Sequence, residues 1–337
     1  MQDFTELVDL ASEKLGGSVL MANDEFFAPK ENLLRASSPV FIEGKYTDRG
    51  KWMDGWETRR RRTPGFDWCI LRLGVPGKIR GVVVDTSFFR GNYPEHFSLE
   101  GTTLPGPHED SELLSDSINW IPLLPQLQLA GNAQNSFPVE YDQKLTHLRL
   151  KIYPDGGVAR FRVFGEVVPD VDELIRRGNQ VDLAAVENGG RVLLCSDMFF
   201  GHRHNLIMPG RAVNMSDGWE TKRRRGPGHD WAIIKLGLPG HVRYVEVDTS
   251  HFKGNFPESC SLEAYSAEGA VENDLTDLSL VWKTILPRTK LQAHSLHRFV
   301  NEVQDVGPAT HVRFNIFPDG GVGRLRVYGS IAPAGAR

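Results

Sequence analysis

The sequence predicts an all-β fold with two tandem antiparallel β-sandwich or jelly-roll domains in a chain of 337 residues. Three observations support this class. A long block of the chain occurs twice, short segments alternate between apolar and polar residues, and turns rich in Gly and Pro separate these segments. The chain has no GxGxxG sequence, no P-loop and no alternation of strands with helices, so a nucleotide-binding α/β fold is not expected.

The duplication sets the domain organisation. Residues 54–101 and 217–264 align without a gap, and 31 of the 48 paired positions are identical. Further matches extend the repeat over almost the whole chain: 8–34 with 181–207, 119–137 with 281–299, and 147–165 with 311–329. A repeat of this length indicates duplicated domains rather than a short-period solenoid. We expect domains at 1–169 and 175–333, joined by the polar stretch 169–180.

Each unit is expected to open with a short helix. In the first unit Leu7, Leu10, Ala11 and Leu15 recur at helical spacing, and two glycines follow them. The first unit also carries about ten extra residues after Leu34, rich in Gly, Ser and charge, which predict a surface loop.

The remainder of each unit is expected to form strands. Leu148, Leu150 and Ile152 alternate with polar residues, and the alternation resumes after the turn sequence PDGG, which predicts a β-hairpin over 147–165. Residues 68–74 and 79–89 predict two further strands separated by a VPG turn.

Composition narrows the function classes. Hydrophobic residues make up 40% and charged residues 24% of the chain, as in ordinary globular proteins, and the net charge of −4 argues against nucleic acid as a partner. No apolar run is long enough to span a membrane, and no secretory signal is evident. Three cysteines form no disulfide framework, which favours the cytoplasm, and their setting does not indicate a nucleophile.

An arginine-rich motif is the first candidate for chemistry. DGWETRRRR and its twin DGWETKRRR contain Glu220, Arg223 and Arg224 in the second copy. Arginine forks bind carboxylates through paired hydrogen bonds, so one or two of these arginines could hold an anion. The alternative is an exposed charged strand that pairs with acidic residues across the sheet.

A strand-end acid is the second candidate. Asp248 follows an apolar run and precedes a turn that contains Lys253 and Asn255. Such an aspartate can cap a turn through its own side chain, or it can serve as a site carboxylate and general base.

The histidines are concentrated in the second unit. His229 and His251 replace Phe66 and Phe88 of the first copy, next to Asp230 and Ser250, which favours the second unit for chemistry unless these positions only pack an interface. His202 and His204, if they lie in a strand, would share one face and form a weak candidate metal pair. His147 and His311 agree between the copies and are expected to be structural.

The repeated motifs resemble those of the allantoicase family. DGWETRRRR and VDTSFFRGNYPE recur as DGWETKRRR and VDTSHFKGNFPE, with NDEFFAPKENLL before them and YPDGGVARFRVFG after them. The resemblance covers nearly the whole chain. It implies two galactose-binding-like jelly rolls, hydrolysis of allantoate to ureidoglycolate and urea, homo-oligomers and, in some members, a divalent metal such as manganese.

On this basis the second copy supplies a set of expected roles. Arg223 or Arg224 binds the substrate carboxylate, Glu220 or Asp248 accepts hydrogen bonds from the ureido groups, and His229 or His251 carries the proton to the departing urea. Asp230, Lys253 and Asn255 complete the expected binding set. Two other readings are a non-catalytic sandwich that binds a small polar, carbohydrate-like ligand, and a structural scaffold.

Overall fold

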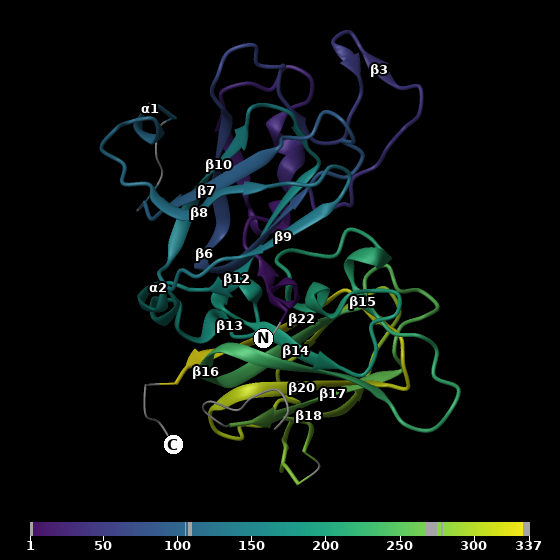
Figure 1. Ribbon diagram of the computed structural model, residues 1–337. Coiled ribbons are helices and arrows are strands. Elements are labelled where there is room, and N and C mark those ends of the chain that lie inside the picture. The colour runs from purple at the N-terminus through teal and green to yellow at the C-terminus, as the bar shows by residue number, and fades with distance from the viewer. Residues whose placement is uncertain (1–2, 105, 107–109, 267–274, 278, 333–337) are drawn as a thin grey trace. The chain divides into compact units, whose positions relative to one another are not determined.

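The chain divides into two compact units, 1–168 and 169–337. The computed structural model describes residues 3–104, 106, 110–266, 275–277 and 279–332. Strands dominate both units and the helices are short (Figure 1), which confirms the predicted all-β class. No helix among the described residues is long and apolar enough to cross a membrane.

The first unit contains twelve strands and a few helical turns in its described part. The strands are β1 (Val8–Asp9), β2 (Ser18–Ala22), β3 (Tyr46–Thr47), β4 (Gly50–Lys51), β5 (Trp56–Glu57), β6 (Asp67–Asp85), β7 (His96–Thr102), β8 (Ile121–Gln128), β9 (Gln134–Pro138), β10 (Leu145–Tyr153), β11 (Gly157–Val158) and β12 (Arg160–Val167). The helical turns are η1 (Phe4–Glu6), η2 (Glu13–Leu15), η3 (Lys30–Leu34) and α1 (Asp110–Leu113).

The strands of the second unit follow the same order in its described part, except that β3 and β4 have no counterpart there. Its strands are β13 (Val181–Asp182), β14 (Arg191–Cys195), β15 (Trp219–Glu220), β16 (Asp230–Asp248), β17 (Ser259–Tyr265), β18 (Lys283–Lys290), β19 (Leu296–Phe299), β20 (Ala309–Phe317), β21 (Gly321–Val322) and β22 (Arg324–Ile331). Its helical segments are α2 (Val171–Arg176), η4 (Gly178–Gln180), η5 (Val186–Asn188), η6 (Arg203–Ile207) and η7 (Met215–Asp217).

One long strand organises each unit. In the first unit the N-terminal part of β6 pairs with β2 and β10, and its C-terminal part pairs with β9 and β12. The two strands predicted here are therefore a single strand of 19 residues. Pro76 does not interrupt it, because residues 73–76 lie opposite an irregularity of the β10 ladder, between Arg72 and Gly77, and are paired with neither β10 nor β12. In the second unit β16 has the same pairing with β14, β20, β19 and β22.

The two parts of β6 belong to opposite layers of a sandwich. β7 pairs with β10, whereas β9 pairs with the other end of β6. Phe97 of β7 and Phe137 of β9 nevertheless have ring centroids only 4.7 Å apart. The layers therefore meet through their apolar side chains, and burial of these side chains is the main force that holds the unit together.

The β-hairpin predicted over 147–165 does not form, because its two strands, β10 and β12, do not pair with each other. β10 pairs with the N-terminal part of β6 and with β7, whereas β12 pairs with the C-terminal part of β6 and with β1. The PDGG segment therefore carries the chain from one layer to the other. Local turn chemistry indicates where the chain bends, but the partner of the returning strand is decided by burial of its apolar face.

The predicted opening helix is absent as a continuous helix. The 3₁₀ turns η1 and η2 flank the two-residue strand β1, although Leu10 and Leu15 are buried as expected. Gly17 closes this segment so tightly that a Cβ atom would lie 1.9 Å from the carbonyl oxygen of Ala11. The helical spacing of leucines thus marked buried positions rather than a helix. In the second unit α2 lies in the stretch that was predicted to be a linker.

His147 and His311 lie in the strands that flank the core, as their expected structural role requires. They are only 3% and 2% exposed, and the Nδ1 atom of each lies 2.8 Å from the hydroxyl oxygen of the preceding threonine. Burial, with a smaller contribution from nearby Lys235, lowers the pKa of His311 to about 4. The folded protein therefore holds this imidazole neutral.

This burial predicts acid sensitivity. The unfolded chain binds a proton at His311 below its ordinary pKa of about 6.5, whereas the folded chain does not until about pH 4, so stability falls as the pH drops through this window. We expect the wild type to lose about 1–3 kcal/mol more than His311→Gln between about pH 7 and about pH 4.5. Urea unfolding at the two pH values measures this difference, and equal losses would contradict it.

Candidate active site

Three short segments of the second unit surround a cavity of about 620 Å³. They are β15 with the arginine run after it, the turn 254–258, and the segment 318–320, with Phe200 and Lys290 completing the wall. Backbone bonds hold these segments together, because β15 pairs with β21 and the N–H of Gly321 donates to the carbonyl of Asn255 at 2.8 Å. Glycine is required at 321, since a Cβ atom there would lie 1.9 Å from the ring of Phe252.

Glu220 and Asn255 form a hydrogen-bonded pair on the cavity wall. The side-chain amide of Asn255 donates to Oε1 of Glu220, so the amide fixes the position of the carboxylate. Both side chains are partly exposed, and both line the cavity. A carboxylate in this position can accept hydrogen bonds or a proton from a molecule inside the cavity.

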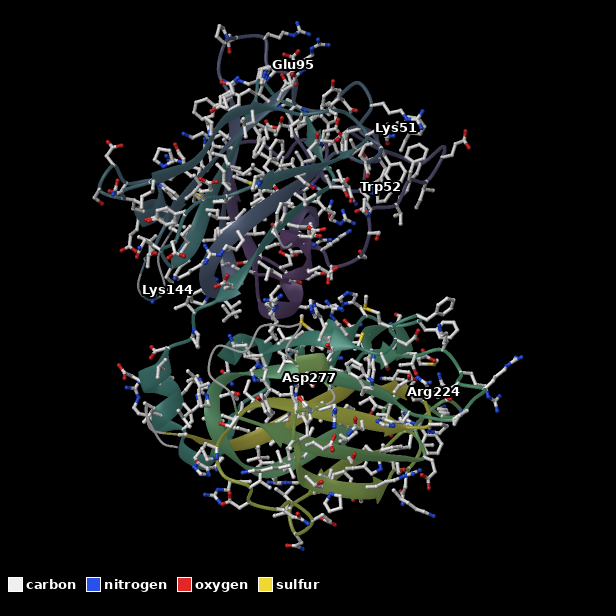
Figure 2. The ribbon with its side chains drawn as sticks, turned by 60° about the horizontal axis from the view of Figure 1, so that its bottom comes forward. Lys51, Trp52, Glu95, Lys144, Arg224 and Asp277 are labelled. Carbon is white, nitrogen blue, oxygen red and sulfur yellow. The ribbon has the colours of Figure 1, made fainter. Side chains whose placement is uncertain are left out.

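The arginine run divides into two roles. The backbone N–H of Arg224 donates to Asp319 at 2.8 Å, and its guanidinium is 2.5 Å from Oδ1 of Asp230, which is 1% exposed. Arg224, labelled in Figure 2, is thus anchored to the fold by Asp230, the first residue of β16 and the buried half of that pair. Arg223 is exposed, lines the cavity and forms no ion pair with a described carboxylate. Of the two arginines, Arg223 is the one available to a ligand.

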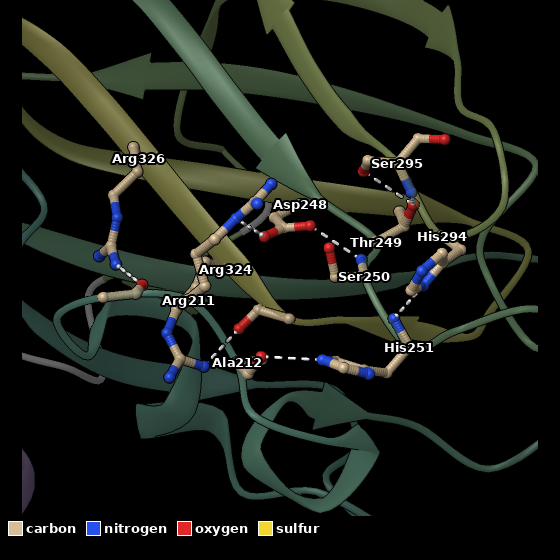
Figure 3. A network of polar contacts seen from close by, with 12 residues as sticks. Arg211, Ala212, Asp248, Thr249, Ser250, His251, His294, Ser295, Arg324 and Arg326 are labelled. Atoms are coloured by element: carbon tan, nitrogen blue, oxygen red, sulfur yellow. Dashed lines mark hydrogen bonds and ion pairs between the residues drawn. The ribbon is translucent and has the colours of Figure 1, made fainter.

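Asp248 and His251 form a separate network (Figure 3). Oδ1 of Asp248 accepts the N–H of Ser250 at 2.8 Å, and its Oδ2 lies 3.6 Å from Nε of Arg211. His251 places Nε2 2.9 Å from the carbonyl oxygen of Ala212, and its backbone N–H donates to Nδ1 of His294. Asp248 therefore caps its turn, and neither Asp248 nor His251 is among the residues that line the 620 Å³ cavity.

The turn at His251 is strained in both units. His251 has a φ of +72° and His294 one of +50°, and the equivalent Phe88 and Asn132 have +70° and +52°. Because a phenylalanine shares this conformation, the strain belongs to the common fold and is not specific to histidine.

His229 and Lys253, which were also predicted to belong to the site, lie outside the wall of the 620 Å³ cavity. Nε2 of His229 is 3.3 Å from Oδ1 of Asn315, and its ring packs on Phe317 at 4.7 Å. Lys253 is exposed in the turn beside Gly254 and is not part of the cavity wall.

His202 and His204 lie at the start of the 3₁₀ turn η6, so the condition for a shared strand face is not met. Their ring centroids are 4.7 Å apart, and burial lowers the pKa of His204 to about 3. No group of three or more His, Cys, Asp or Glu side chains in the described part of the chain is arranged to hold a metal ion. The described residues therefore do not fit a three-ligand metal centre.

Several residues of the cavity wall were missed by sequence reasoning. They are Phe200, Glu258, Lys290 and Asp319. Asp319 belongs to the PDGG sequence and Glu258 to the FPE sequence, and both are identical in the two copies, so the internal comparison contained this signal. Lys290 corresponds to Gln128 and could have been noticed only as a change of charge.

The first unit retains much of this framework. Asn92 donates to Glu57 at 2.6 Å, the N–H of Arg61 donates to Asp155 at 2.8 Å, and the Arg61 guanidinium pairs with Asp67 at 2.8 Å. Glu57 is only 8% exposed, and burial raises the pKa of its carboxyl, an effect that the hydrogen bond from Asn92 opposes. The second unit therefore offers its glutamate to a cavity, whereas the first unit keeps the equivalent glutamate buried.

The cysteines take no part in this cavity. Cys69 and Cys260 are fully buried, and burial raises the pKa of the Cys260 thiol to about 12 and that of Cys69 further. These two thiols therefore stay protonated, which makes them poor nucleophiles.

Comparison with known proteins gives consistent matches over both units. The sequence model of the Allantoicase repeat matches residues 8–168 and 181–332. A probable allantoicase of Pseudomonas aeruginosa strain UCBPP-PA14 is 50% identical over 97% of each chain, and one of Photobacterium profundum is 49% identical over 97% of each chain. The crystal structure of allantoicase from Saccharomyces cerevisiae is similar with a TM-score of 0.79 and 36% identity, covering 96% of this chain and 92% of the yeast chain.

Proposed function

The chain belongs to the allantoicase family, and from that premise we propose that its chemistry takes place in the 620 Å³ cavity of the second unit. The reaction is the hydrolysis of allantoate to ureidoglycolate and urea. Allantoate has one carboxylate and two ureido groups on a single carbon, so its site requires a cation, acceptors for N–H groups and a means of moving a proton. The observation that carries the proposal is the Glu220–Asn255 pair on a wall that also contains Arg223 and Lys290.

Binding follows from charge and hydrogen bonding. Arg223 and Lys290 form no ion pair with a described carboxylate, so both cations are available to the substrate carboxylate. One oxygen of Glu220 is held by Asn255, which leaves the other to accept an N–H of a ureido group. Arg224 contributes indirectly, because its bonds to Asp230 and Asp319 fix the segment that presents Arg223.

The hydrolytic step breaks one bond between the central carbon and a ureido nitrogen. The oxygen of water bonds to that carbon, one proton of the water reaches the departing nitrogen, and urea leaves. The lone pair of the remaining ureido nitrogen assists the departure. We assign the proton transfer to Glu220, which would take the proton from water and give it to the leaving nitrogen. Urea release from allantoate by the purified protein and its Glu220→Gln variant tests this assignment.

The histidines are expected to matter less than Glu220. Because His229 and His251 do not line the cavity, His229→Gln and His251→Asn should each lower kcat by less than about tenfold. Asparagine is chosen at 251 because it tolerates the positive φ. The urea-release rate at saturating allantoate measures this. A decrease in kcat of about 10²-fold in either variant would show that the substituted histidine, and not Glu220, transfers the proton.

We further propose that the chain forms a homo-oligomer in the cytoplasm. Large apolar side chains are exposed at Val40, Ile42, Tyr46 and Val213, which suits contact with another copy, and the three free cysteines suit a reducing compartment. Light scattering during size exclusion would show a single-chain mass if the oligomer proposal is wrong.

A further inference from the structure

The first unit contains a cavity of about 550 Å³ that the proposed reaction does not use. It is lined by Phe41, Lys51, Met53, Phe88, Arg90, Gly91 and Asn92. Phe41 belongs to the extra residues that only the first unit carries after Leu34, and Lys51 lies in the small hairpin formed by β3 and β4. The insertion therefore provides part of the wall as well as being an exposed loop.

The lining of this cavity is cationic. It contains Lys51 and Arg90 but no carboxylate, and neither cation forms an ion pair with an acidic side chain in the part of the chain that the structure describes. Nζ of Lys51 lies 4.6 Å from the centroid of the Phe41 ring, which holds the charge beside the cavity (Figure 2 shows Lys51). Two unpaired cations facing one space attract an anion.

Two phenylalanine rings form the apolar part of the cavity lining. The rings of Phe41 and Phe88 are stacked, with centroids 5.8 Å apart and planes inclined by 25°. Phe88 stands where the second unit has His251, so the ring pair is specific to the first unit. Stacked rings offer a flat surface to a planar group such as a ureido group.

Asn92 connects this cavity to the repeated framework. Its side-chain amide donates to Glu57 at 2.6 Å, and its backbone carbonyl accepts the N–H of Gly157 at 2.7 Å. The equivalent Asn255 lines the proposed active cavity of the second unit. In each unit, therefore, a glutamate-held asparagine borders a cavity, but the cations come from different segments of the two repeats.

We propose that the first unit holds a second binding site, for a small carboxylate that carries a planar ureido group. Lys51 and Arg90 bind the carboxylate, Phe41 and Phe88 cover the planar group, and Asn92 hydrogen-bonds to it. The presence of a site for an anion is inferred from the cavity and its two cations. The choice of a ureido carboxylate as the ligand rests on the proposed function. This site binds without hydrolysis, because its glutamate is buried behind Asn92.

Isothermal titration of the full chain with N-carbamoylglycine tests the site. This compound has one carboxylate and one ureido group, and it lacks the second ureido nitrogen that assists departure of urea. We expect two binding events per chain in the wild type. Lys51→Gln and Arg90→Gln should each weaken one event at least about tenfold, equivalent to about 1.4 kcal/mol, whereas Lys144→Gln, an exposed cation of the same unit, should change neither.

The second of the two binding events is expected to occur in the proposed active cavity of the second unit. Arg223→Gln should weaken it and leave the event sensitive to Lys51 and Arg90 unchanged. A single event, no binding, or two events that neither Lys51→Gln nor Arg90→Gln alters would overturn the second site. Loss of one event in Lys51→Gln with no effect of Arg223→Gln would support the second site and contradict the proposed active cavity, so the two failures are distinct. Circular dichroism of each variant confirms that it is folded.

Discussion

Glu220→Gln is expected to lower kcat for urea release by about 10²-fold or more. Glutamine keeps the size of the side chain and can still accept the hydrogen bond from Asn255, so the cavity keeps its shape. What it loses is the negative charge and the ability to take a proton. The rate of urea release at saturating allantoate measures the effect, and the KM should change less than kcat if binding depends mainly on Arg223 and Lys290.

A matched variant separates chemistry from general charge effects. Glu302 is an exposed glutamate of the same unit that is not among the residues lining the 620 Å³ cavity. Glu302→Gln should therefore leave kcat unchanged. If Glu220→Gln retains most of its turnover while remaining folded, Glu220 is not the group that moves the proton.

Arg160→Met is expected to destabilise the first unit by about 3–5 kcal/mol. Arg160 is 1% exposed and Asp54 is 6% exposed, and the guanidinium reaches both carboxylate oxygens, at 3.3 and 2.8 Å. It also donates to the carbonyls of Ser37 and Ala159 at 2.9 and 2.7 Å. Methionine fills much of the volume but leaves Asp54 as a buried charge whose remaining partners are the exposed Arg35, at 3.5 Å, and the backbone N–H of Val40, at 3.0 Å.

Urea unfolding followed by circular dichroism measures this loss. Arg176→Met provides the control, because Arg176 pairs with Glu173 at 2.7 Å on the surface of α2, where both side chains are largely exposed. Surface pairs of this kind contribute about 0–1 kcal/mol. Equal destabilisation by the two substitutions would show that burial of the Arg160–Asp54 pair does not matter.

Much of the fold could be predicted because its signals are local or repeated. Alternation of apolar residues places Leu148 and Leu150 on one face of a strand whatever its partner is, and both are buried in β10. The opening segment shows the limit of such signals. Leu10 and Leu15 are buried as predicted, but two 3₁₀ turns and a short strand place them there. The spacing of apolar residues along the sequence indicates which side chains face the core, but more than one backbone conformation can place them there.

In the candidate site, too, the sequence identified some residues and only the structure located the others. Glu220, Arg223 and Asn255 were selected by sequence, and all three line one cavity. Lys290 and Asp319 come from segments distant in sequence, so no local pattern connects them with Glu220. His229 and His251 differ from Phe66 and Phe88 at the same positions of the first copy, but a difference between copies does not measure distance from a cavity.

The sequence by itself determined the duplication, the all-β class, the family and the residue types available for binding a carboxylate. Each of these is a property of composition, period or identity along the chain. Only the tertiary structure decided that β6 is one strand shared by two layers, that β10 and β12 do not pair, and that Arg224 is bound to Asp230 while Arg223 is available. These outcomes depend on contacts between residues far apart in the chain, and burial of apolar surface selects among the pairings that the local pattern allows.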